Sequence, residues 1–392
     1  MKRVLMSASV GAMIYNFNMD NIEILQEMGY QVDVACNFSE KENIMPKEKI
    51  QKFKQMLIDK DITVFETDCP RKIYSIFKII RTYFQMKKIM NAREYSLIYT
   101  QSPIGGVLGR LAARKSRKNG AKVIYTAHGF HFFKGGPLLS WLFFYPIEKF
   151  CSKYNDVLIT INKEDYYLAQ KKFYSETVKL IPGVGVDISR FKSCMIDKTE
   201  KRREMGIGEN SFVLLSVGEL ALRKNHDVVI EAIGRINQKS SLNIVYVIAG
   251  QGELKEKYEQ KAENLNVNLK LLGFRSDIEE LCAMADVFVH PSIREGLGIA
   301  PLEAMASGLP LISSYINGIR DYTENNVSGM CVKDPTSVSE MESAILAMMD
   351  NDVRERWSEN NKKKAIEYSI ENSKKAMKNI FEEVLVESER LA

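Results

Sequence analysis

Short runs of β-branched and other apolar residues alternate with amphipathic stretches along most of the chain, and this alternation restricts the fold more than any other feature. It favours βαβ units and a parallel sheet, because two parallel strands need a crossover that a helix usually supplies. In the first half we predict strands at 3–8, 32–36, 63–66, 97–100, 123–127, 157–161 and 178–181, with helices at 17–28, 73–92, 104–116, 137–153 and 163–173.

The alternation breaks once, in the run GVGVDISRFKSCMIDK from Gly183 to Lys198, and then starts again. Strands are predicted after the break at 213–217, 244–249, 270–273, 287–290 and 310–313. A chain of 392 residues exceeds the size at which single cores stop growing. We therefore predict two doubly wound α/β domains, at 1–183 and 199–367, with a linker at 184–198 and a terminal amphipathic helix at 368–392.

Composition narrows the class of protein. With 45% hydrophobic and 27% charged residues, the chain resembles an ordinary globular protein rather than a disordered one. Six scattered cysteines without a CxxC pair favour reduced thiols over a disulfide framework or a zinc site. The apolar start is too short for a signal peptide, and the longest apolar stretch, Leu138–Ile147, is about half of a membrane span. We expect a cytoplasmic protein.

Charge is divided unevenly between the halves. The net charge of +5 consists of +11 for residues 1–190 and −6 for residues 191–392, which suggests different partners for the two domains. Residues 71–93 carry seven Lys or Arg and no acid, with apolar residues at roughly helical spacing. An anionic membrane is one candidate partner, aided by aromatic residues at Phe130–Phe133 and Leu138–Tyr145. Nucleic acid is the weaker candidate, since no DNA- or RNA-binding motif accompanies the charge.

Residues 286–310, DVFVHPSIREGLGIAPLEAMASGLP, predict a strand, a glycine turn and a helix that Pro301 opens and Gly308 ends. A helix start beside a glycine loop offers backbone N–H groups to a phosphate. Two carboxylates, Glu295 and Glu303, flank this loop. They would repel a phosphate unless they face hydroxyl groups, and a nucleotide sugar carries hydroxyls on both sides of its diphosphate. Two surface glutamates on a plain βα unit are the alternative.

The pair Glu295 and Glu303 in REGLGIAPLEAMASGLP resembles the donor-site signature of the retaining family-4 glycosyltransferases with the GT-B fold. The stretches YTAHGFHF, LIPGVGVD, LLSVGELALRKNH and LLGFRSDI match as well, so the resemblance covers nearly the whole chain. QSPIGGVLGRLAAR and TAHGFHFFKGGPLLSWLFFYPIEKF further resemble enzymes of bacterial capsule and exopolysaccharide synthesis. The implied fold is a pair of Rossmann-like domains facing a cleft, with the terminal helix returning to the first domain.

The resemblance implies a set of site residues. Glu295 would hold the donor sugar, Lys224 the diphosphate, and His128, at the end of a predicted strand, a sugar hydroxyl. Glu303 would hold the ribose. The remaining donor-binding candidates are Gly296, Leu297, Gly298, Ile299, Ala300, Arg275, Gly218, Glu219, Gly250 and Gly11. Many relatives carry arginine where this chain has Glu219, so the second cation at the diphosphate is open between Arg223, Arg275 and Arg294, with Arg275 favoured.

A metal site is not expected. His128 and His131 are separated by a glycine and have no carboxylate nearby in sequence, and the DxD runs at Asp59–Asp61 and Asp350–Asp352 do not follow strands. No dinucleotide or P-loop glycine motif is present. We expect no cofactor and no metal.

The sequence therefore predicts a retaining, metal-independent glycosyltransferase that moves a sugar from a nucleotide diphosphate sugar, UDP-linked by preference, to a lipid-linked glycan at the inner face of the membrane. Two alternatives stay open. A nucleotide-sugar epimerase of the same architecture would share the diphosphate site, and a non-catalytic sugar-binding scaffold would share the fold.

Overall fold

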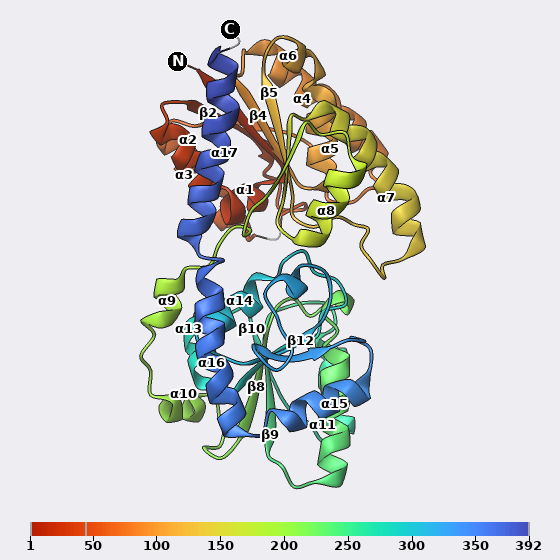
Figure 1. Ribbon diagram of the computed structural model, residues 1–392, viewed down its shortest axis with the longest axis vertical. Coiled ribbons are helices and arrows are strands. Elements are labelled where there is room, and N and C mark those ends of the chain that lie inside the picture. Colours follow the sequence, from red (N-terminus) through yellow and green to blue (C-terminus); the bar gives the residue numbers. More distant parts are fainter. Residues whose placement is uncertain (1, 44, 391–392) are drawn as a thin grey trace. The chain divides into compact units, whose positions relative to one another are not determined.

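The computed structural model describes residues 2–43 and 45–390, with side chains up to Leu385. It divides into two compact units. The first contains the residues up to Val184 and those from Glu371 onward, and the second contains Gly185–Ile370 (Figure 1). Both units are parallel α/β sheets, as the alternation in the sequence predicts.

The first unit is built on a seven-stranded parallel sheet in the order β3-β2-β1-β4-β5-β6-β7. All seven predicted strands are confirmed to within two residues at each end. Their bounds are β1 (Arg3–Val10), β2 (Gln31–Asn37), β3 (Thr63–Glu66), β4 (Leu97–Gln101), β5 (Lys122–Ala127), β6 (Val157–Thr160) and β7 (Thr177–Leu180). The strand order reverses between β1 and β4, which makes the carboxyl ends of these two strands the place where such sheets bind ligands.

The helices of this unit are more divided than predicted. The helix predicted at 17–28 corresponds to α2, the stretch 104–116 is two helices, and α1 and α3 were not predicted. The bounds are α1 (Gly11–Phe17), α2 (Met19–Glu27), α3 (Lys47–Asp59), α4 (Ile76–Ala92), α5 (Pro103–Ala112), α6 (Arg114–Lys118), α7 (Leu138–Cys151), α8 (Lys163–Lys172) and α17 (Ile370–Arg390), with a 3₁₀ turn at Ser152–Tyr154.

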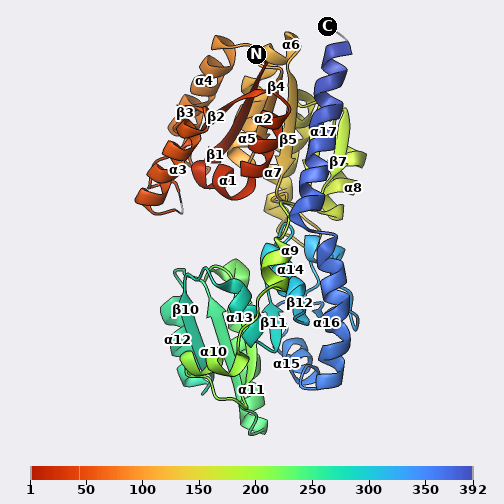
Figure 2. The same ribbon diagram turned by 90° about the vertical axis from the view of Figure 1, so that its left-hand side faces the viewer.

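The second unit has a six-stranded parallel sheet in the order β10-β9-β8-β11-β12-β13. Five strands were predicted, and the sixth, β13, was missed. The strands are β8 (Phe212–Val217), β9 (Ile244–Ala249), β10 (Asn268–Gly273), β11 (Val287–His290), β12 (Leu311–Ser314) and β13 (Gly329–Val332). Every residue of β9, IVYVIA, is buried. This is expected for a parallel strand in a sheet with helices on both sides, an arrangement that Figure 2 shows for this unit.

Helices flank this sheet, and 3₁₀ turns cover Leu222–Lys224 and Asn317–Asp321. The α-helices are α9 (Ile188–Lys192), α10 (Lys198–Glu204), α11 (His226–Lys239), α12 (Lys255–Asn264), α13 (Ile278–Met284), α14 (Ile299–Ala306), α15 (Val338–Ala347) and α16 (Asn351–Ile366).

The stretch predicted as a linker, 184–198, groups with the second unit from Gly185 onward and contains α9. Val186 pairs with Ser369 where the chain returns, through hydrogen bonds from Val186 N to the Tyr368 carbonyl (2.9 Å) and from Ile370 N to the Val186 carbonyl (3.0 Å). Gly185 has φ +86°, and a Cβ there would lie 2.5 Å from the backbone of Ile370. Only glycine fits this close approach. The predicted terminal helix, 368–392, begins here, and its last two residues lie outside the described residues.

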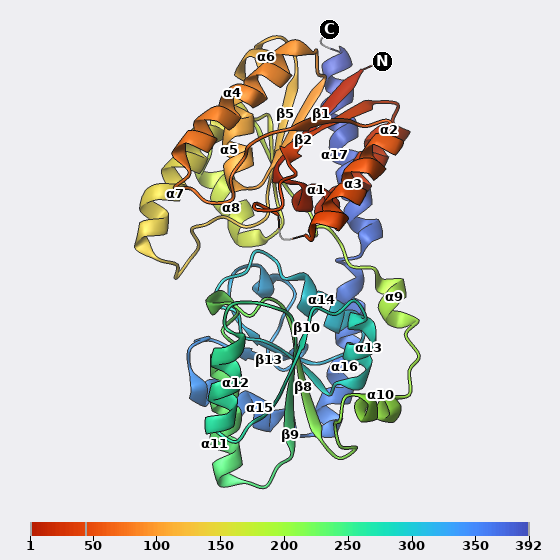
Figure 3. The same ribbon diagram turned by 180° about the vertical axis from the view of Figure 1, so that it is seen from behind.

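Helices α4, α5 and α7 cover one face of the seven-stranded sheet, and α5 packs against both neighbours (Figure 3). A buried ion pair fixes α7 to α5. Arg110 is fully buried, donates to Glu148 at 2.6 Å, and has its guanidinium 3.8 Å from the Tyr125 ring centre. The Tyr125 hydroxyl donates to the same carboxylate at 3.1 Å. Because one face of α7 is held this way, its opposite face is presented to solvent.

Candidate active site

Glu295, in the loop after β11, lies at the centre of a largely buried charged cluster in the second unit. Lys224 Nζ lies 2.6 Å and His290 Nε2 lies 3.4 Å from the same oxygen, Glu295 Oε2. No side chain of the three is more than 16% exposed. Burial favours the neutral acid, but the approach of His290 and the charge of Lys224 outweigh it and hold the pKa of Glu295 well below its ordinary value. The carboxylate is therefore ionised at neutral pH.

Asn225 explains how Lys224 reaches a carboxylate 71 positions away in the sequence. It has left-handed backbone angles (φ 57°, ψ 35°), which asparagine tolerates better than most residues. Its side-chain amide donates to the carbonyls of Pro291 (3.2 Å) and Pro335 (2.7 Å). The loop after β8 is thereby attached to the loop after β11. Sequence reasoning found Lys224 and Glu295, but not His290 or Asn225.

The predicted glycine loop and helix start are present. Gly298 (φ +83°) is the N-cap of α14, and the helix begins at Ile299, two residues before the predicted opening at Pro301. The Tyr322 hydroxyl donates to the Leu297 carbonyl at 2.9 Å, and a Cβ on Gly318 would lie 2.0 Å from the Gly296 carbonyl oxygen. The loop is thus held in place by residues that the sequence did not indicate. The first N–H groups of α14 have no partner within the helix and favour an anion.

Two further glycine candidates, Gly218 and Gly250, have packing reasons of their own. A Cβ on Gly250 would lie 1.7 Å from the Gly218 carbonyl oxygen, and Gly250 also pairs with Gly273. A Cβ on Gly218 would lie 3.3 Å from Cε of Lys224. The glycines therefore let three strand ends approach closely and leave room for the lysine side chain.

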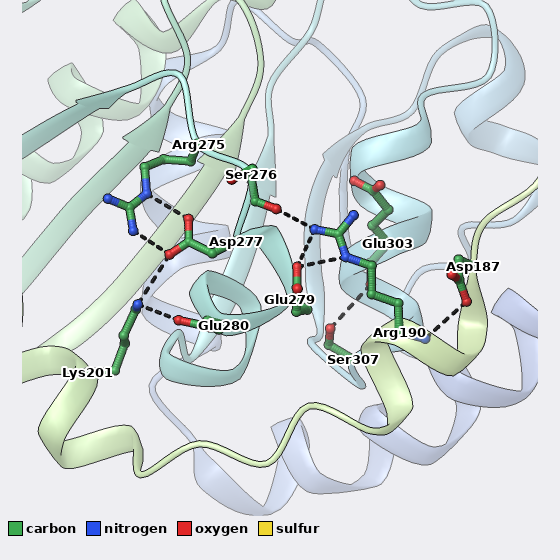
Figure 4. Close-up of polar contacts among 10 residues, drawn as sticks. All are labelled: Asp187, Arg190, Lys201, Arg275, Ser276, Asp277, Glu279, Glu280, Glu303 and Ser307. Carbon is green, nitrogen blue, oxygen red and sulfur yellow. Dashed lines mark hydrogen bonds and ion pairs between the residues drawn. The ribbon is translucent and has the colours of Figure 1, made fainter. Parts of the chain in front are cut away.

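Two of the candidates for a second cation, Arg223 and Arg275, already have acidic partners. Arg223 pairs with Glu219 at 2.8 Å, with both side chains exposed. Arg275 Nε donates to Asp277 at 2.7 Å, and Asp277 also pairs with Lys201 at 3.2 Å (Figure 4). The hydrogen bond from Arg275 is the main reason that the pKa of Asp277 falls to about 2. A diphosphate role for Arg275 therefore requires it to leave or share Asp277.

Glu303, on α14, lies beside an arginine that sequence reasoning missed. Figure 4 shows the Arg190 guanidinium between the carboxylates of Glu279 and Glu303. Arg190 Nε donates to Glu279 at 2.9 Å, and α9 packs against α14. Burial raises the pKa of Glu303, and Arg190 partly opposes that rise. The sequence offered no signal for Arg190, because it lies in the stretch that was predicted as a linker.

In the first unit, His128 follows β5 and its Nε2 lies 3.0 Å from Gln101 Oε1. Its ring centre lies 5.2 Å from that of Phe17. Burial lowers the pKa of His128 to about 4, so the ring is neutral. His131 packs instead on Phe144, with ring centres 4.9 Å apart. Gly11 begins α1, and a Cβ there would press on the Phe38 ring at 3.2 Å.

The expected membrane-facing residues are only partly exposed. Phe130, Phe132 and Phe133 are only 3%, 0% and 8% exposed, so their assignment to a surface was wrong. Phe130 and Phe132 belong to a local core against which Trp141, Tyr145 and Phe173 pack. Leu138, Leu139, Leu142 and Phe143 on α7 are 60–86% exposed. On α4, Lys78 pairs with Glu42 and Arg81 with Asp68, whereas Lys87 and Lys88 have no ion pair within the described residues.

Neither DxD run is part of the cluster around Glu295. Asp59 ends α3, and Asp350 caps α16. Among residues 2–43 and 45–390, no three His, Cys, Asp or Glu residues are grouped so that they could hold a metal ion. No helix in the same residues is long and apolar enough to cross a membrane.

An ionised carboxylate and an ammonium, held against a helix start at the carboxyl ends of a parallel sheet, suit a ligand with hydroxyls on one side and a diphosphate on the other. The two doubly wound units have the architecture of the GT-B glycosyltransferases. Residues 197–364 match the family "Glycosyl transferases group 1", and residues 3–162 match "Glycosyl transferase 4-like". The chain therefore belongs to the glycosyltransferases that these two family descriptions cover.

Full-length relatives support the assignment. EpsD of Bacillus subtilis (strain 168) is named as a glycosyltransferase. It is 37% identical to this chain over 338 residues, which cover 85% of this chain and 84% of EpsD. The UDP-Gal:alpha-D-GlcNAc-diphosphoundecaprenol alpha-1,3-galactosyltransferase of Escherichia coli is 31% identical over 79% of this chain and 80% of its own length.

Solved structures share the fold at low identity. Anabaena Alr3699/HepE in complex with UDP-glucose has a TM-score of 0.75 at 18% identity, over 98% of this chain and 100% of that one. WaaG, a glycosyltransferase involved in lipopolysaccharide biosynthesis, has a TM-score of 0.70 at 20% identity, over 97% of this chain and 99% of its own. The predicted GT-B fold is thereby confirmed.

Proposed function

We propose that this protein is a retaining, metal-independent glycosyltransferase of polysaccharide synthesis, which moves a sugar from a UDP-sugar to a lipid-linked glycan. The observation that carries the proposal is the Lys224–Glu295 pair, at 2.6 Å, beside the start of α14. It supplies one positive and one negative group where a diphosphate and a sugar would meet. The names of the E. coli galactosyltransferase and of the HepE complex support a UDP-sugar, and the former supports a lipid-linked acceptor.

In the proposed reaction the bond between the anomeric carbon and the diphosphate oxygen breaks, and that oxygen gains negative charge. Lys224 and the first N–H groups of α14 would stabilise this charge, and such preorganised groups lower a barrier effectively. Glu295 would accept hydrogen bonds from the sugar hydroxyls, and Glu303 from those of the ribose. The acceptor oxygen bonds to the same face of the sugar, and its proton passes to the leaving diphosphate. No protein nucleophile is required.

The proposal is tested with a panel of UDP- and GDP-sugars, first by thermal unfolding and then by transfer to a lipid-linked glycan. A ligand at about 100 times its Kd should add roughly 2.7 kcal/mol to the free energy of unfolding. NMR of the product should show the anomeric configuration of the donor. Isomerisation of the sugar without acceptor would identify an epimerase instead, and binding without turnover of any donor would identify a sugar-binding scaffold.

Replacing Glu303 by Gln should weaken UDP binding about 10- to 100-fold, because hydrogen bonds to a charged acceptor contribute roughly 1.5–3 kcal/mol. Since the pKa of Glu303 is raised, wild-type affinity should increase with pH as this carboxyl ionises and then level off. Glu303→Gln should lose that part of the pH dependence. Calorimetry across acidic to neutral pH measures both effects, with Glu231→Gln, an exposed carboxylate on α11, as the control. If Glu303→Gln bound UDP with the affinity and pH dependence of the wild type, the assignment of Glu303 to the ribose would be wrong.

Transfer should persist in EDTA at an unchanged rate. The proposed charge stabilisation uses an ammonium and backbone N–H groups, and neither needs a divalent ion. Initial rates with and without EDTA, followed by Mg²⁺ or Mn²⁺ addition, provide the measurement. Complete inhibition that divalent ions reverse would show that a metal ion belongs to the site.

We further propose that the first unit binds an anionic membrane surface at the inner face of the cell membrane. Exposed apolar side chains occur on α7 (Leu138, Leu139, Leu142 and Phe143) and on the first half of α4 (Ile76, Phe77, Ile80 and Phe84), and all are at least 50% exposed. We call these eight residues the apolar ridge. Both helices flank α5 on one face of the sheet (Figure 3). Lys87 and Lys88 on α4, which form no ion pair among the described residues, add the charge complementarity that favours lipid as the occupant.

A further inference from the structure

His128 is connected to a buried side-chain amide pair in the first unit. Gln101 is fully buried and Asn18 is 1% exposed. Asn18 Nδ2 donates to Gln101 Oε1 at 2.9 Å, and Gln101 Nε2 donates in return to Asn18 Oδ1. Gln101 Oε1 also lies 3.0 Å from His128 Nε2. Buried polar groups of this kind are costly unless every hydrogen bond is made, and when satisfied they fix one arrangement.

A backbone carbonyl determines the orientation of the whole chain of amides. Asn18 Nδ2 lies 3.0 Å from the Met13 carbonyl oxygen, which can only accept, so the NH₂ group of Asn18 must be on this side. Its second hydrogen then points to Gln101, which must present its oxygen. Asn21 Nδ2 donates to Asn18 Oδ1 at 3.1 Å, in agreement with this orientation.

The orientation of Gln101 decides which nitrogen of His128 carries the hydrogen. An amide oxygen cannot donate, so His128 Nε2 must donate to it. A neutral imidazole has one N–H, and Nδ1 is therefore left with its lone pair. Within the residues that the structure describes, Nδ1 makes no hydrogen bond. A cavity of about 30 Å³ lies beside the ring, lined among others by Phe17, Asn21 and Thr126.

We infer that Asn18 and Gln101 are positioning residues, which lock His128 in the Nε2–H tautomer so that Nδ1 accepts a hydrogen bond from a sugar hydroxyl. This inference rests on the proposed function for the identity of the ligand. It makes His128 selective for a group that can donate, so a hydroxyl is accepted and an ether or a carbonyl at the same position is not. The amide pair needs no contact with substrate to have this effect.

The test uses the full chain labelled with ¹⁵N-histidine, which has four histidines. The signals of His128 are those absent from His128→Asn. At neutral pH the wild-type ring should show the Nε2–H tautomer. Gln101→Met should give a mixture of tautomers, and Gln101→Glu, which places a carboxylate against Nε2, should give the doubly protonated ring. An Nδ1–H tautomer in the wild type would overturn the inference without any variant.

The steady-state kinetics of the Gln101 variants show whether Gln101 positions His128 or only stabilises the fold. Gln101→Met should lower kcat at least 10-fold with the KM for the nucleotide sugar little changed, and Gln101→Glu should shift the acid limb of the pH–rate profile upward. Wild-type kinetics in Gln101→Met, or an unshifted profile in Gln101→Glu, would show that the amide pair only packs. If His128 shows the expected tautomer but the protein transfers no sugar, the inference about Asn18 and Gln101 holds and the proposed function is wrong.

Discussion

Glu295→Gln should reduce sugar transfer by about 100- to 1000-fold, comparable to the loss when one preorganised hydrogen-bonding group is removed from a reacting centre. UDP affinity should stay the same or increase. In the wild type Lys224 is paired with Glu295 at 2.6 Å, and the neutral amide leaves the ammonium free to bind the diphosphate. A loss of turnover with unchanged or tighter nucleotide binding is what a contact with the donor sugar predicts.

Two variants make the result specific. Lys224→Met should weaken UDP binding, because it removes the cation and leaves Glu295 beside the diphosphate. Glu231→Gln, on the exposed side of α11, should change neither property. If Glu295→Gln weakened UDP binding as much as Glu303→Gln does, the assignment of the two carboxylates to opposite ends of the donor would be wrong.

The sequence predicted most of the sheets because parallel strands buried on both faces consist of continuous apolar runs. The run IVYVIA, which is β9, is short for a helix and rich in β-branched residues, and both features favour a strand. β13, with the sequence GMCV, was missed because glycine, methionine and cysteine carry little strand preference. It is a strand because Leu311–Ser314 pairs with it along its whole length. That pairing is a tertiary contact, which no local pattern reports.

The site was predictable only in part, for a related reason. Glu295, Glu303 and the glycine loop lie within one short stretch of sequence, so their spacing carries information. Lys224 was found by resemblance alone, since its distance from Glu295 depends on the amide of Asn225 and two carbonyl groups. Arg190 was missed because its neighbours, Glu279 and Glu303, come from elements 89 and 113 positions later.

The exposure of the aromatic residues between Phe130 and Tyr145 also depends on tertiary contacts that the sequence pattern does not show. Phe130–Phe133 and Leu138–Tyr145 are separated by only four residues in the sequence, and we expected both at the surface. The structure buries the first group and exposes much of the second. The difference arises because Phe130 and Phe132 stack on each other, with ring centres 5.0 Å apart and an interplanar angle of 8°, over β5 and α8. By contrast, α7 is held to α5 through the buried pair of Arg110 and Glu148 on its other face.

The protein should therefore bind vesicles of phosphatidylglycerol and phosphatidylcholine, and bind pure phosphatidylcholine much less. Each basic residue near an anionic surface contributes about 1 kcal/mol, which salt screens. Each leucine or phenylalanine that is fully buried contributes roughly 1.5–3 kcal/mol, which salt does not screen. Changing Leu138, Leu139, Leu142 and Phe143 together to serine should lower vesicle binding at least 100-fold at any salt concentration.

Lys87→Gln with Lys88→Gln should instead reduce binding mainly at low salt, since it removes only the screened contribution. A matched control changes four exposed apolar residues outside the apolar ridge, Ile58, Met195, Leu346 and Ile366, to serine. These residues are scattered singly, as is normal on protein surfaces, and their loss should not affect binding. Vesicle sedimentation measures all three, and transfer to a water-soluble acceptor checks that the variants stay active. If the variant with serine at the four α7 positions sedimented like the wild type, α7 would not enter the membrane.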